Sequence, residues 1–326
     1  MINIDNIIQD VSLFIINNDT SFHIGYGIDN NYARCVGTSI ASICLNNPNE
    51  KFSFHIVTNY LSHNNINKFK DLSNKYKINI YIYTINEQLF LSLPVSNYFP
   101  ISIYFRLILP LIVKNTNIIK YLDADIICLN RIDIEFITKN IQTKTILAVP
   151  DVSYMQKNRC KALNLNNHIY FNSGFLVINK KRWEEQSVFH QVLQILNEKH
   201  HQFTHPDQDA LNIVCKNNTG YLDKTYNCID LSNIILNNII FLHFAANPKP
   251  WSIAWKFSKN NNTFNRELYT KYENNTPWKG SPLSPPRNYK EMEFYAKGLR
   301  KHFQLKRGLY WYCKYIFSKI KKRLNP

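Results

Sequence analysis

Three short apolar segments near the N-terminus alternate with two segments of helical periodicity. Residues 22–28, 52–58 and 78–83 are rich in apolar, aromatic and β-branched residues, as buried strands are. Residues 36–45 and 61–76 place apolar side chains three or four positions apart, which predicts helices. Residues 1–20, before the first strand, are mixed and polar and are expected to form a short helix or arm. Strand–helix–strand units with short links require parallel strands joined by crossover helices. We therefore expect an α/β fold with a mostly parallel central sheet flanked by helices.

An apolar run at residues 117–129 is interrupted by two carboxylates, Asp123 and Asp125. Burying two unpaired carboxylates is costly, so a compensating charge is expected, and a divalent cation is the obvious candidate. A strand ending at this pair would place two oxygen ligands at the carboxyl edge of the sheet, where α/β folds bind ligands. The alternative is a loop Asp beside an ion-paired Asp.

A predicted helix at residues 101–111 carries Arg106 among apolar neighbours. A buried guanidinium needs an anionic partner. That partner could be a bound phosphate, the Asp123 and Asp125 pair, or a carboxylate in a purely structural salt bridge.

Polar residues also flank the predicted strands. The acidic turn at residues 29–32 either caps the following helix or holds a nucleotide. The sequence lacks a Gly-x-Gly-x-x-Gly motif, so a dinucleotide cofactor is not expected. Residues 172–174, Asn-Ser-Gly, are expected to form a tight polar turn before a buried strand, where such groups can bind a polyol. A strand at residues 145–149 leads to Asp151.

Two more polar clusters lie towards the C-terminal half. A helix is predicted at residues 182–196. Asp207, Gln208 and Asp209 open a further predicted helix, and Asp207 either caps it or serves a site. His243 lies at the end of an apolar strand predicted at residues 239–244, where it is either a satisfied core residue or a ligand. Lys249 lies nearby in the sequence and could bind a phosphate.

Positive charge is concentrated at the C-terminus. The formal net charge is +16, and residues 287–326 hold twelve Lys or Arg against two Glu, a net of +10. Apolar residues recur there at helical spacing with basic residues on the other side, which is typical of a helix lying on a membrane surface. A basic helix packed on the core is the alternative. The apolar residues are Leu305, Leu309, Tyr312, Ile316 and Ile320, and the basic ones are Arg307, Lys314 and Lys321.

Composition restricts the compartment and the class of protein. The 45% hydrophobic content is ordinary for a globular chain, and 326 residues can bury a large core. Seven widely spaced cysteines without a Cys-x-x-Cys pair indicate buried thiols rather than a disulfide scaffold or a zinc knuckle. No basic segment followed by an apolar core opens the chain, and no run is long and apolar enough to span a bilayer. We expect a cytoplasmic protein without a signal peptide.

Taken together, the motifs resemble those of glycosyltransferase family 8, the retaining enzymes of the GT-A fold, and most of all its bacterial lipopolysaccharide core glucosyl- and galactosyltransferases. The resemblance covers residues 20–255 and implies a Rossmann-like sheet. It also implies an N-terminal arm (1–20), a catalytic domain (21–258) and a helical basic extension (259–326). The motifs are Asp-Asn-Asn-Tyr (29–32), Phe-Arg-Leu (105–107), Tyr-Leu-Asp-Ala-Asp (121–125), Phe-Asn-Ser-Gly (171–174), Pro-Asp-Gln-Asp-Ala-Leu-Asn (206–212), and His-Phe with a later Pro-Trp (243–251).

The resemblance implies a role for each motif. Asp123, Asp125 and His243 would hold Mn²⁺ or Mg²⁺ on the diphosphate of a UDP-sugar. Gln208 would lie beneath the anomeric carbon, and Asp209 is the alternative, covalent nucleophile. The implied donor-binding residues are Gly27, Ile28, Asp29, Asn31, Tyr32, Arg106, Asp123, Ala124, Asn172, Ser173, Asp207 and Lys249. The implied acceptor-binding residues are Asp151, Ala245 and Ala246, the last of which stands where the family usually has glycine.

The implied reaction transfers glucose or galactose from UDP to a hydroxyl of the lipopolysaccharide core, forming an α linkage. The basic tail would then hold the enzyme on the cytoplasmic face of the bacterial inner membrane, near its phosphorylated acceptor. One alternative is another bacterial glycan or a protein as acceptor. Others are metal-dependent phosphoryl transfer at the Asp pair and a basic nucleic-acid-binding protein. Nucleic acid is not expected, because the basic residues gather in the tail rather than among exposed aromatics.

Overall fold

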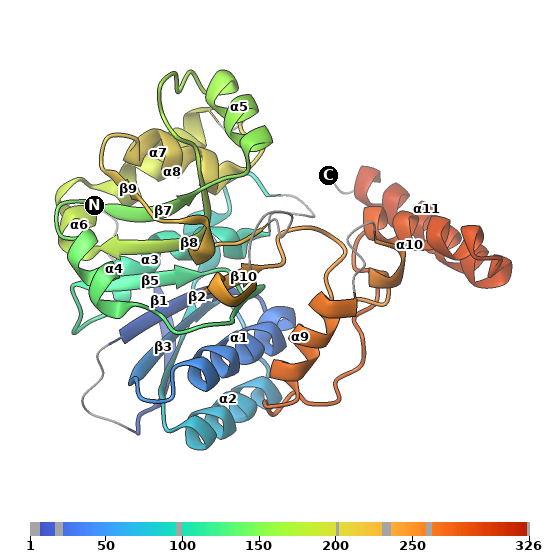
Figure 1. Cartoon of the computed structure of the whole chain (residues 1–326). Coiled ribbons are helices and arrows are strands. Elements are labelled where there is room, and N and C mark those ends of the chain that lie inside the picture. Colours follow the sequence, from blue (N-terminus) through green and yellow to red (C-terminus); the bar gives the residue numbers. More distant parts are fainter. Residues whose placement is uncertain are drawn as a thin grey trace. The chain divides into compact units, whose positions relative to one another are not determined.

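The structure, a computed structural model, describes residues 7–16, 22–95, 100–199, 202–229, 236–258 and 263–324 (Figure 1). The chain divides into two compact units, Met1–His243 and Phe244–Pro326. Both sheets belong to the first unit.

An eight-stranded mixed sheet forms the centre of the first unit. Its strands are β1 (Ile8–Phe14), β2 (Phe22–Ile28), β3 (Phe52–Thr58), β4 (Asn79–Ile85), β5 (Ile118–Leu122), β7 (Ile146–Pro150), β8 (Phe171–Asn179) and β9 (Thr219–Tyr221). They lie in the order β1-β4-β3-β2-β5-β8-β7-β9. Strands β4, β3, β2 and β5 are parallel to one another, which confirms the predicted parallel start. Strands β1 and β8 run antiparallel to their neighbours.

The described part of the first unit also contains α-helices. They are α1 (Ala33–Asn46), α2 (His63–Tyr76), α3 (Phe105–Ile112), α4 (Ile134–Asn140), α5 (Ser153–Ala162), α6 (Lys180–Glu185), α7 (Val188–Lys199) and α8 (Pro206–Cys215). Figure 1 shows α1 and α2 side by side along the sheet. Every residue of β3 is buried, as expected for a central parallel strand covered on both faces.

Two glycines in β2 allow the chain around α3 to pack directly on the sheet. A Cβ at Gly25 would overlap the Leu109 side chain. At Gly27 a Cβ would lie 2.8 Å from Phe105 Cβ and 2.9 Å from the Ser102 carbonyl oxygen. This close packing brings Arg106 beside the carboxyl end of β5.

A second, two-stranded sheet joins distant parts of the chain. Strand β6 (Ile126–Cys128) pairs antiparallel with β10 (Phe241–His243), and His243 lies opposite Ile126. The predicted strand at residues 239–244 is thus confirmed but shorter. Its pairing places His243 next to the turn that carries Asp123 and Asp125.

The structure differs from the predicted local structure in three places. Residues 8–14 were expected in a short helix or arm but form edge strand β1, whose exposed polar residues hide the strand pattern. Residues 172–174 lie inside β8 rather than in a turn. The β7–β8 register shifts there, from Ala148 opposite Leu176 to Val149 opposite Asn172. The helix expected at 182–196 is broken between α6 and α7, where Ser187 has φ 49°.

The second unit contains helices α9 (Thr263–Glu273), α10 (Tyr289–Lys301) and α11 (Leu305–Leu324). Helices α10 and α11 pack closely at Gly308, where a Cβ would lie 2.7 Å from Arg300 Cγ. Trp311 meets the Tyr295 ring edge-on, with centroids 5.4 Å apart. Within the described ranges, no helix is both long enough and apolar enough to cross a membrane.

A buried histidine pair lies across β2 and β3, next to Tyr83 on β4. His23 Nδ1 is 3.0 Å from His55 Nε2, and His55 Nδ1 is 3.1 Å from the Tyr83 hydroxyl. Burial, together with Lys120 and Lys180, lowers the pKa of His23 from 6.5 to about 4. Burial and the neighbouring His23 lower the pKa of His55 well below its usual value.

This pair predicts a loss of stability in acid. Between about pH 6.5 and pH 4 the unfolded chain binds protons that the folded His23 and His55 refuse, so the free energy of unfolding falls as the pH falls. We expect the melting temperature to drop across this window and His55→Gln to flatten the drop. Circular dichroism melts at a series of pH values would measure it. An equally steep drop in His55→Gln would contradict this origin.

Candidate active site

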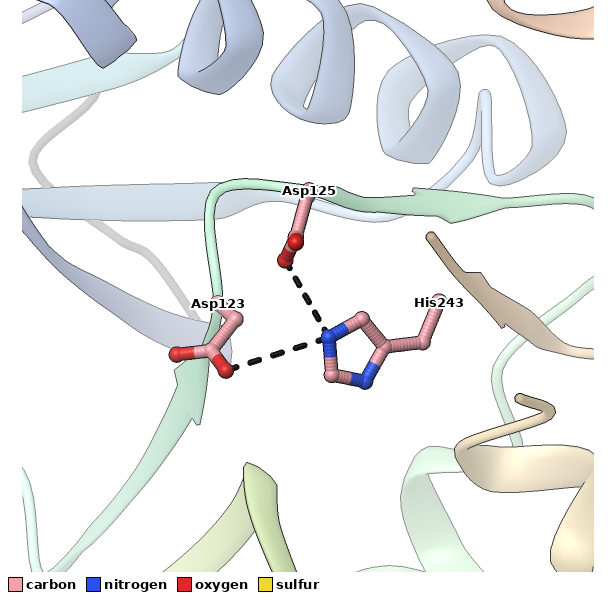
Figure 2. A group of neighbouring side chains, drawn as sticks. All are labelled: Asp123, Asp125 and His243. Carbon is pink, nitrogen blue, oxygen red and sulfur yellow. Dashed lines mark ion pairs between the residues drawn. The ribbon is translucent and has the colours of Figure 1, made fainter. Parts of the chain in front are cut away.

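Three potential metal ligands meet at the carboxyl end of β5. Asp123 and Asp125 flank the turn between β5 and β6, and His243 ends β10 (Figure 2). His243 Nε2 lies 3.2 Å from Asp125 Oδ1 and 3.9 Å from Asp123 Oδ2. One ligand atom from each residue lies within 4.8 Å of the others. The predicted position of the Asp pair at the end of a strand is therefore confirmed.

The spacing of these atoms fits a divalent cation. Ligand atoms about 2.0–2.2 Å from a common ion lie roughly 3–4 Å apart, and the separations of 3.2 and 3.9 Å match this. Two carboxylate oxygens and one imidazole nitrogen are a donor set that Mn²⁺ accepts. The same residues form ion pairs with one another when the imidazole is protonated.

Two neighbours orient the Asp123 carboxylate by binding the oxygen that does not face His243. Arg106 Nη2 and the Tyr121 hydroxyl each donate a hydrogen bond of 2.8 Å to Asp123 Oδ1. Asp123 Oδ2 is then the oxygen that faces His243 (Figure 2). Tyr121 could not be singled out from the sequence, because a Tyr within an apolar strand looks like an ordinary core residue.

The buried Arg106 has carboxylate partners, as predicted. Besides Asp123, its Nε lies 3.2 Å from Asp207 Oδ2, and its Nη1 donates to the Ser173 carbonyl at 2.6 Å and hydroxyl at 2.7 Å. Burial disfavours the charged guanidinium, but Asp123 and Asp207 outweigh burial and raise the pKa of Arg106. The Arg106 side chain is only 5% exposed, so its charge is balanced by these contacts rather than by solvent.

Asp207 opens α8 without capping it. The N-cap residue is His205, and the Asp207 carboxylate is directed at Arg106 and the Ser173 hydroxyl instead. Burial raises the pKa of Asp207, and Arg106 opposes this increase. The interpretation of Asp207 as an N-cap is therefore wrong.

The Gln208 amide is held in one orientation. Its Oε1 accepts the Ser173 N–H at 2.9 Å, and its Nε2 donates to Asp151 Oδ2 at 2.9 Å and to the Tyr170 hydroxyl at 3.0 Å. A backbone N–H can only donate, so the oxygen of the amide must face Ser173. Gln208 thereby connects the end of β7 with β8.

Asp209 is fully buried and its carboxylate is saturated. Arg159 donates from Nη2 at 2.7 Å and from Nε at 3.1 Å, and the Tyr170 hydroxyl donates at 2.6 Å. The N–H groups of Thr204 and His205 each donate to Oδ2 at 3.0 Å. Arg159 and Tyr170 could not be singled out from the sequence, because nothing local in α5 or just before β8 signals contact with α8.

The remaining predicted residues lie in two places. Asp29 accepts the N–H groups of Asn31 and Tyr32, so it caps the following turn, which was one of the two interpretations. Ile28 is buried at the end of β2, and Ala124 lies in the turn between β5 and β6. In the second unit, Lys249 donates to the carbonyl oxygens of Phe244 and Ala245, and Ala245 and Ala246 are exposed.

Comparison with known proteins identifies relatives over most of the chain. The model of glycosyl transferase family 8 matches residues 23–254, and that of its C-terminal region matches residues 266–319. The lipopolysaccharide glucosyltransferase WaaO of Escherichia coli K12 is 31% identical, with 91% of both chains covered. A lipopolysaccharide 1,3-galactosyltransferase of Salmonella typhimurium LT2 is 27% identical, covering 92% of this chain and 91% of its own length.

A solved structure shares the fold. The galactosyltransferase LgtC, crystallised with donor and acceptor sugar analogs, superposes with a TM-score of 0.68 at 19% identity. The alignment covers 79% of this chain and 99% of that one. The mostly parallel sheet flanked by helices is thus the GT-A fold that the resemblance implied.

The buried Arg159–Asp209 pair predicts a large effect on stability. Asp209→Ala leaves the guanidinium of Arg159 without its carboxylate in a buried place, which costs about 3–5 kcal/mol. We expect a lower urea midpoint for Asp209→Ala. Lys181→Ala, which removes the exposed Lys181–Glu185 pair, serves as the control and should change little. Equal effects of the two substitutions would contradict the assigned role of Asp209.

Proposed function

Because the chain belongs to glycosyltransferase family 8, we propose that it transfers glucose or galactose from a UDP-sugar to a hydroxyl of the lipopolysaccharide core, with retention of configuration. The observation that carries this proposal is the cluster of Asp123, Asp125 and His243 at the carboxyl edge of a GT-A sheet. The names of the relatives support the acceptor, and both glucosyl- and galactosyltransferases are among them. In this proposal residues 21–258 form the catalytic domain and residues 259–326 the extension.

The cluster suits the departure of a diphosphate. A Mn²⁺ or Mg²⁺ held by Asp123, Asp125 and His243 would supply positive charge to the leaving UDP. Asp123 keeps one oxygen for this purpose because Arg106 and Tyr121 occupy the other. Lys249 would add a second cation at the diphosphate, and residues 27–32 would bind uridine.

Gln208 is the residue we place beneath the anomeric carbon. An amide is a poor nucleophile, whereas its carbonyl oxygen can stabilise positive charge that develops on the sugar ring. The acceptor hydroxyl would then attack from the face of the leaving group and give its proton to the departing phosphate. Asp151 accepts a hydrogen bond from the Gln208 amide, so it would lie near the same carbon and would face the acceptor.

Asp209 is a positioning residue in this proposal rather than a covalent nucleophile. Both carboxylate oxygens already accept hydrogen bonds, and the residue is fully buried. Its contact with Tyr170 holds the hydroxyl that meets the Gln208 amide. A glycosyl adduct trapped on Asp209 and identified by mass spectrometry would contradict this assignment.

An exposed apolar stripe on α11 supports attachment to a membrane surface. Leu309 and Phe317 are 63% and 72% exposed, and Lys314 and Lys321 lie beside the stripe on the same helix. Such a helix binds at the level of lipid headgroups, with its basic side chains on anionic lipids. Tyr312, predicted in this stripe, is instead half-buried against Tyr315. The exposed apolar residues of this stripe are Leu305, Leu309, Tyr310, Ile316, Phe317 and Ile320.

We propose that the protein acts at the cytoplasmic face of the inner membrane.

A donor panel tests the proposed reaction. Each nucleotide sugar is incubated with the enzyme, Mn²⁺ and lipopolysaccharide core acceptor, and UDP release is measured. We expect UDP release from UDP-glucose or UDP-galactose. The variant Asp125→Ala should lose both this release and the Mn²⁺-dependent binding of UDP. The circular dichroism spectrum of this variant should stay unchanged. Release from no UDP-sugar, or undiminished release by Asp125→Ala, would contradict the proposal.

Vesicle sedimentation tests the role of α11. The double variant Leu309→Ser and Phe317→Ser should lose most binding to vesicles that contain anionic phospholipid, while UDP release with a short soluble acceptor persists. The matched control replaces Leu13 and Leu91, which are 51% and 64% exposed in the first unit, by Ser. Full binding by the α11 variant, or an equal loss in the control, would contradict the role of this helix.

A further inference from the structure

The hydrogen bonds that lead from β8 to His243 Nδ1 form a chain. In this chain each donor determines the orientation of the next side chain. The chain begins at the backbone N–H of Gly174, which lies 2.9 Å from Asn172 Oδ1. A backbone N–H can only donate, so the side-chain atom of Asn172 at this position must be the oxygen. The orientation of the Asn172 amide is therefore fixed by β8.

Asn227 continues this chain towards the imidazole. One terminal atom of its amide lies 2.8 Å from Asn172 Oδ1, and the other lies 2.9 Å from His243 Nδ1. Because Asn172 presents an oxygen, the facing atom of Asn227 must be its NH₂ group. The oxygen of Asn227 must then face His243.

This arrangement determines the tautomer of His243. An amide oxygen accepts and cannot donate, so Nδ1 of the neutral imidazole has to carry the proton. The lone pair is then on Nε2, the nitrogen that faces Asp123 and Asp125 (Figure 2). Metal-binding histidines in proteins are commonly oriented through their second nitrogen in this way.

Burial and backbone pairing hold Asn227 in place. Asn227 is 3% exposed and His243 is 5% exposed, which leaves little room for water to replace the amide. The residue after Asn227 is paired with β10 on both sides: Cys228 N–H donates to the Phe241 carbonyl, and the His243 N–H donates to the Cys228 carbonyl, each at 2.9 Å. The backbone thereby fixes the distance between the amide and the imidazole.

Gly174 is part of the same hydrogen-bond chain. A Cβ at this position would lie 2.5 Å from His243 Cε1 and 2.9 Å from both Asn172 Oδ1 and Asp123 Oδ2. A glycine is therefore needed where its N–H starts the chain, because any side chain would push the imidazole and Asp123 apart.

We propose that Asn227 is a positioning residue that sets the Nδ1–H tautomer of His243 and so presents Nε2 to a divalent cation. The part that concerns the cation rests on the proposed function, whereas the tautomer does not. In this proposal Asn172 orients the Asn227 amide, because its oxygen accepts hydrogen bonds from both the Gly174 N–H and Asn227.

Nitrogen NMR of the metal-free full-length protein, labelled at histidine with ¹⁵N, tests the tautomer. Spectra are recorded at alkaline pH, and the His243 signals are identified by their absence in His243→Gln. We expect a protonated Nδ1 and an unprotonated Nε2 in the wild type and in Asn227→Asp, which keeps an oxygen towards the ring. Asn227→Ala should show a mixture of tautomers. A protonated Nε2 in the wild type, or an unchanged tautomer in Asn227→Ala, would overturn the inference.

Mn²⁺ titration by electron paramagnetic resonance is the second measurement. Asn227→Ala should bind the ion about 10–100-fold more weakly than the wild type. Asn79→Ala is the matched control, because Asn79 is 1% exposed and binds Ser53 and the Ile16 N–H away from the site. Equal weakening in both variants would overturn the positioning role. A wild type that shows the Nδ1–H tautomer and binds Mn²⁺ but transfers no sugar would refute the proposed function alone.

Discussion

The buried guanidinium of Arg106 is the interaction on which the rest of the site depends. It joins α3, the end of β5, β8 and the first turn of α8 through Asp123, Ser173 and Asp207. A guanidinium in this position would be very unfavourable without these carboxylates, and the buried carboxylate of Asp207 would be unfavourable without Arg106. These elements are therefore held at one geometry. The geometry leaves the second oxygen of Asp123 directed at His243.

From Arg106 the polar groups extend through the site with their orientations determined by backbone N–H groups. The Ser173 N–H fixes the amide of Gln208, and the Gly174 N–H fixes that of Asn172. Both donors come from the segment of β8 where its pairing with β7 shifts register. The shift releases these N–H groups from the ladder, because bulged residues are not paired across the strands. The irregular segment of β8 is thus the scaffold for two side-chain amides of the site.

Local patterns explain which parts of this structure were predictable. The β2–α1–β3–α2–β4 segment follows from hydrophobic periodicity, and the Asp123 and Asp125 pair from the cost of carboxylates in an apolar run. By contrast, edge strand β1 and the shift in β8 depend on pairing between distant residues, which periodicity does not encode. Asn227 and Arg159 act only through partners far away in the sequence. An isolated Asn or Arg carries no signal of such a contact.

The central claim is that Asp123, Asp125 and His243 together hold a divalent cation against a UDP leaving group. Crystals grown with Mn²⁺ and UDP, with diffraction collected at the manganese absorption edge, test it most directly. We expect one anomalous peak about 2.0–2.2 Å from Asp123 Oδ2, an Asp125 oxygen and His243 Nε2, with the diphosphate completing the coordination. A peak that lacks any of these three protein ligands, or UDP bound without an ion there, would contradict it.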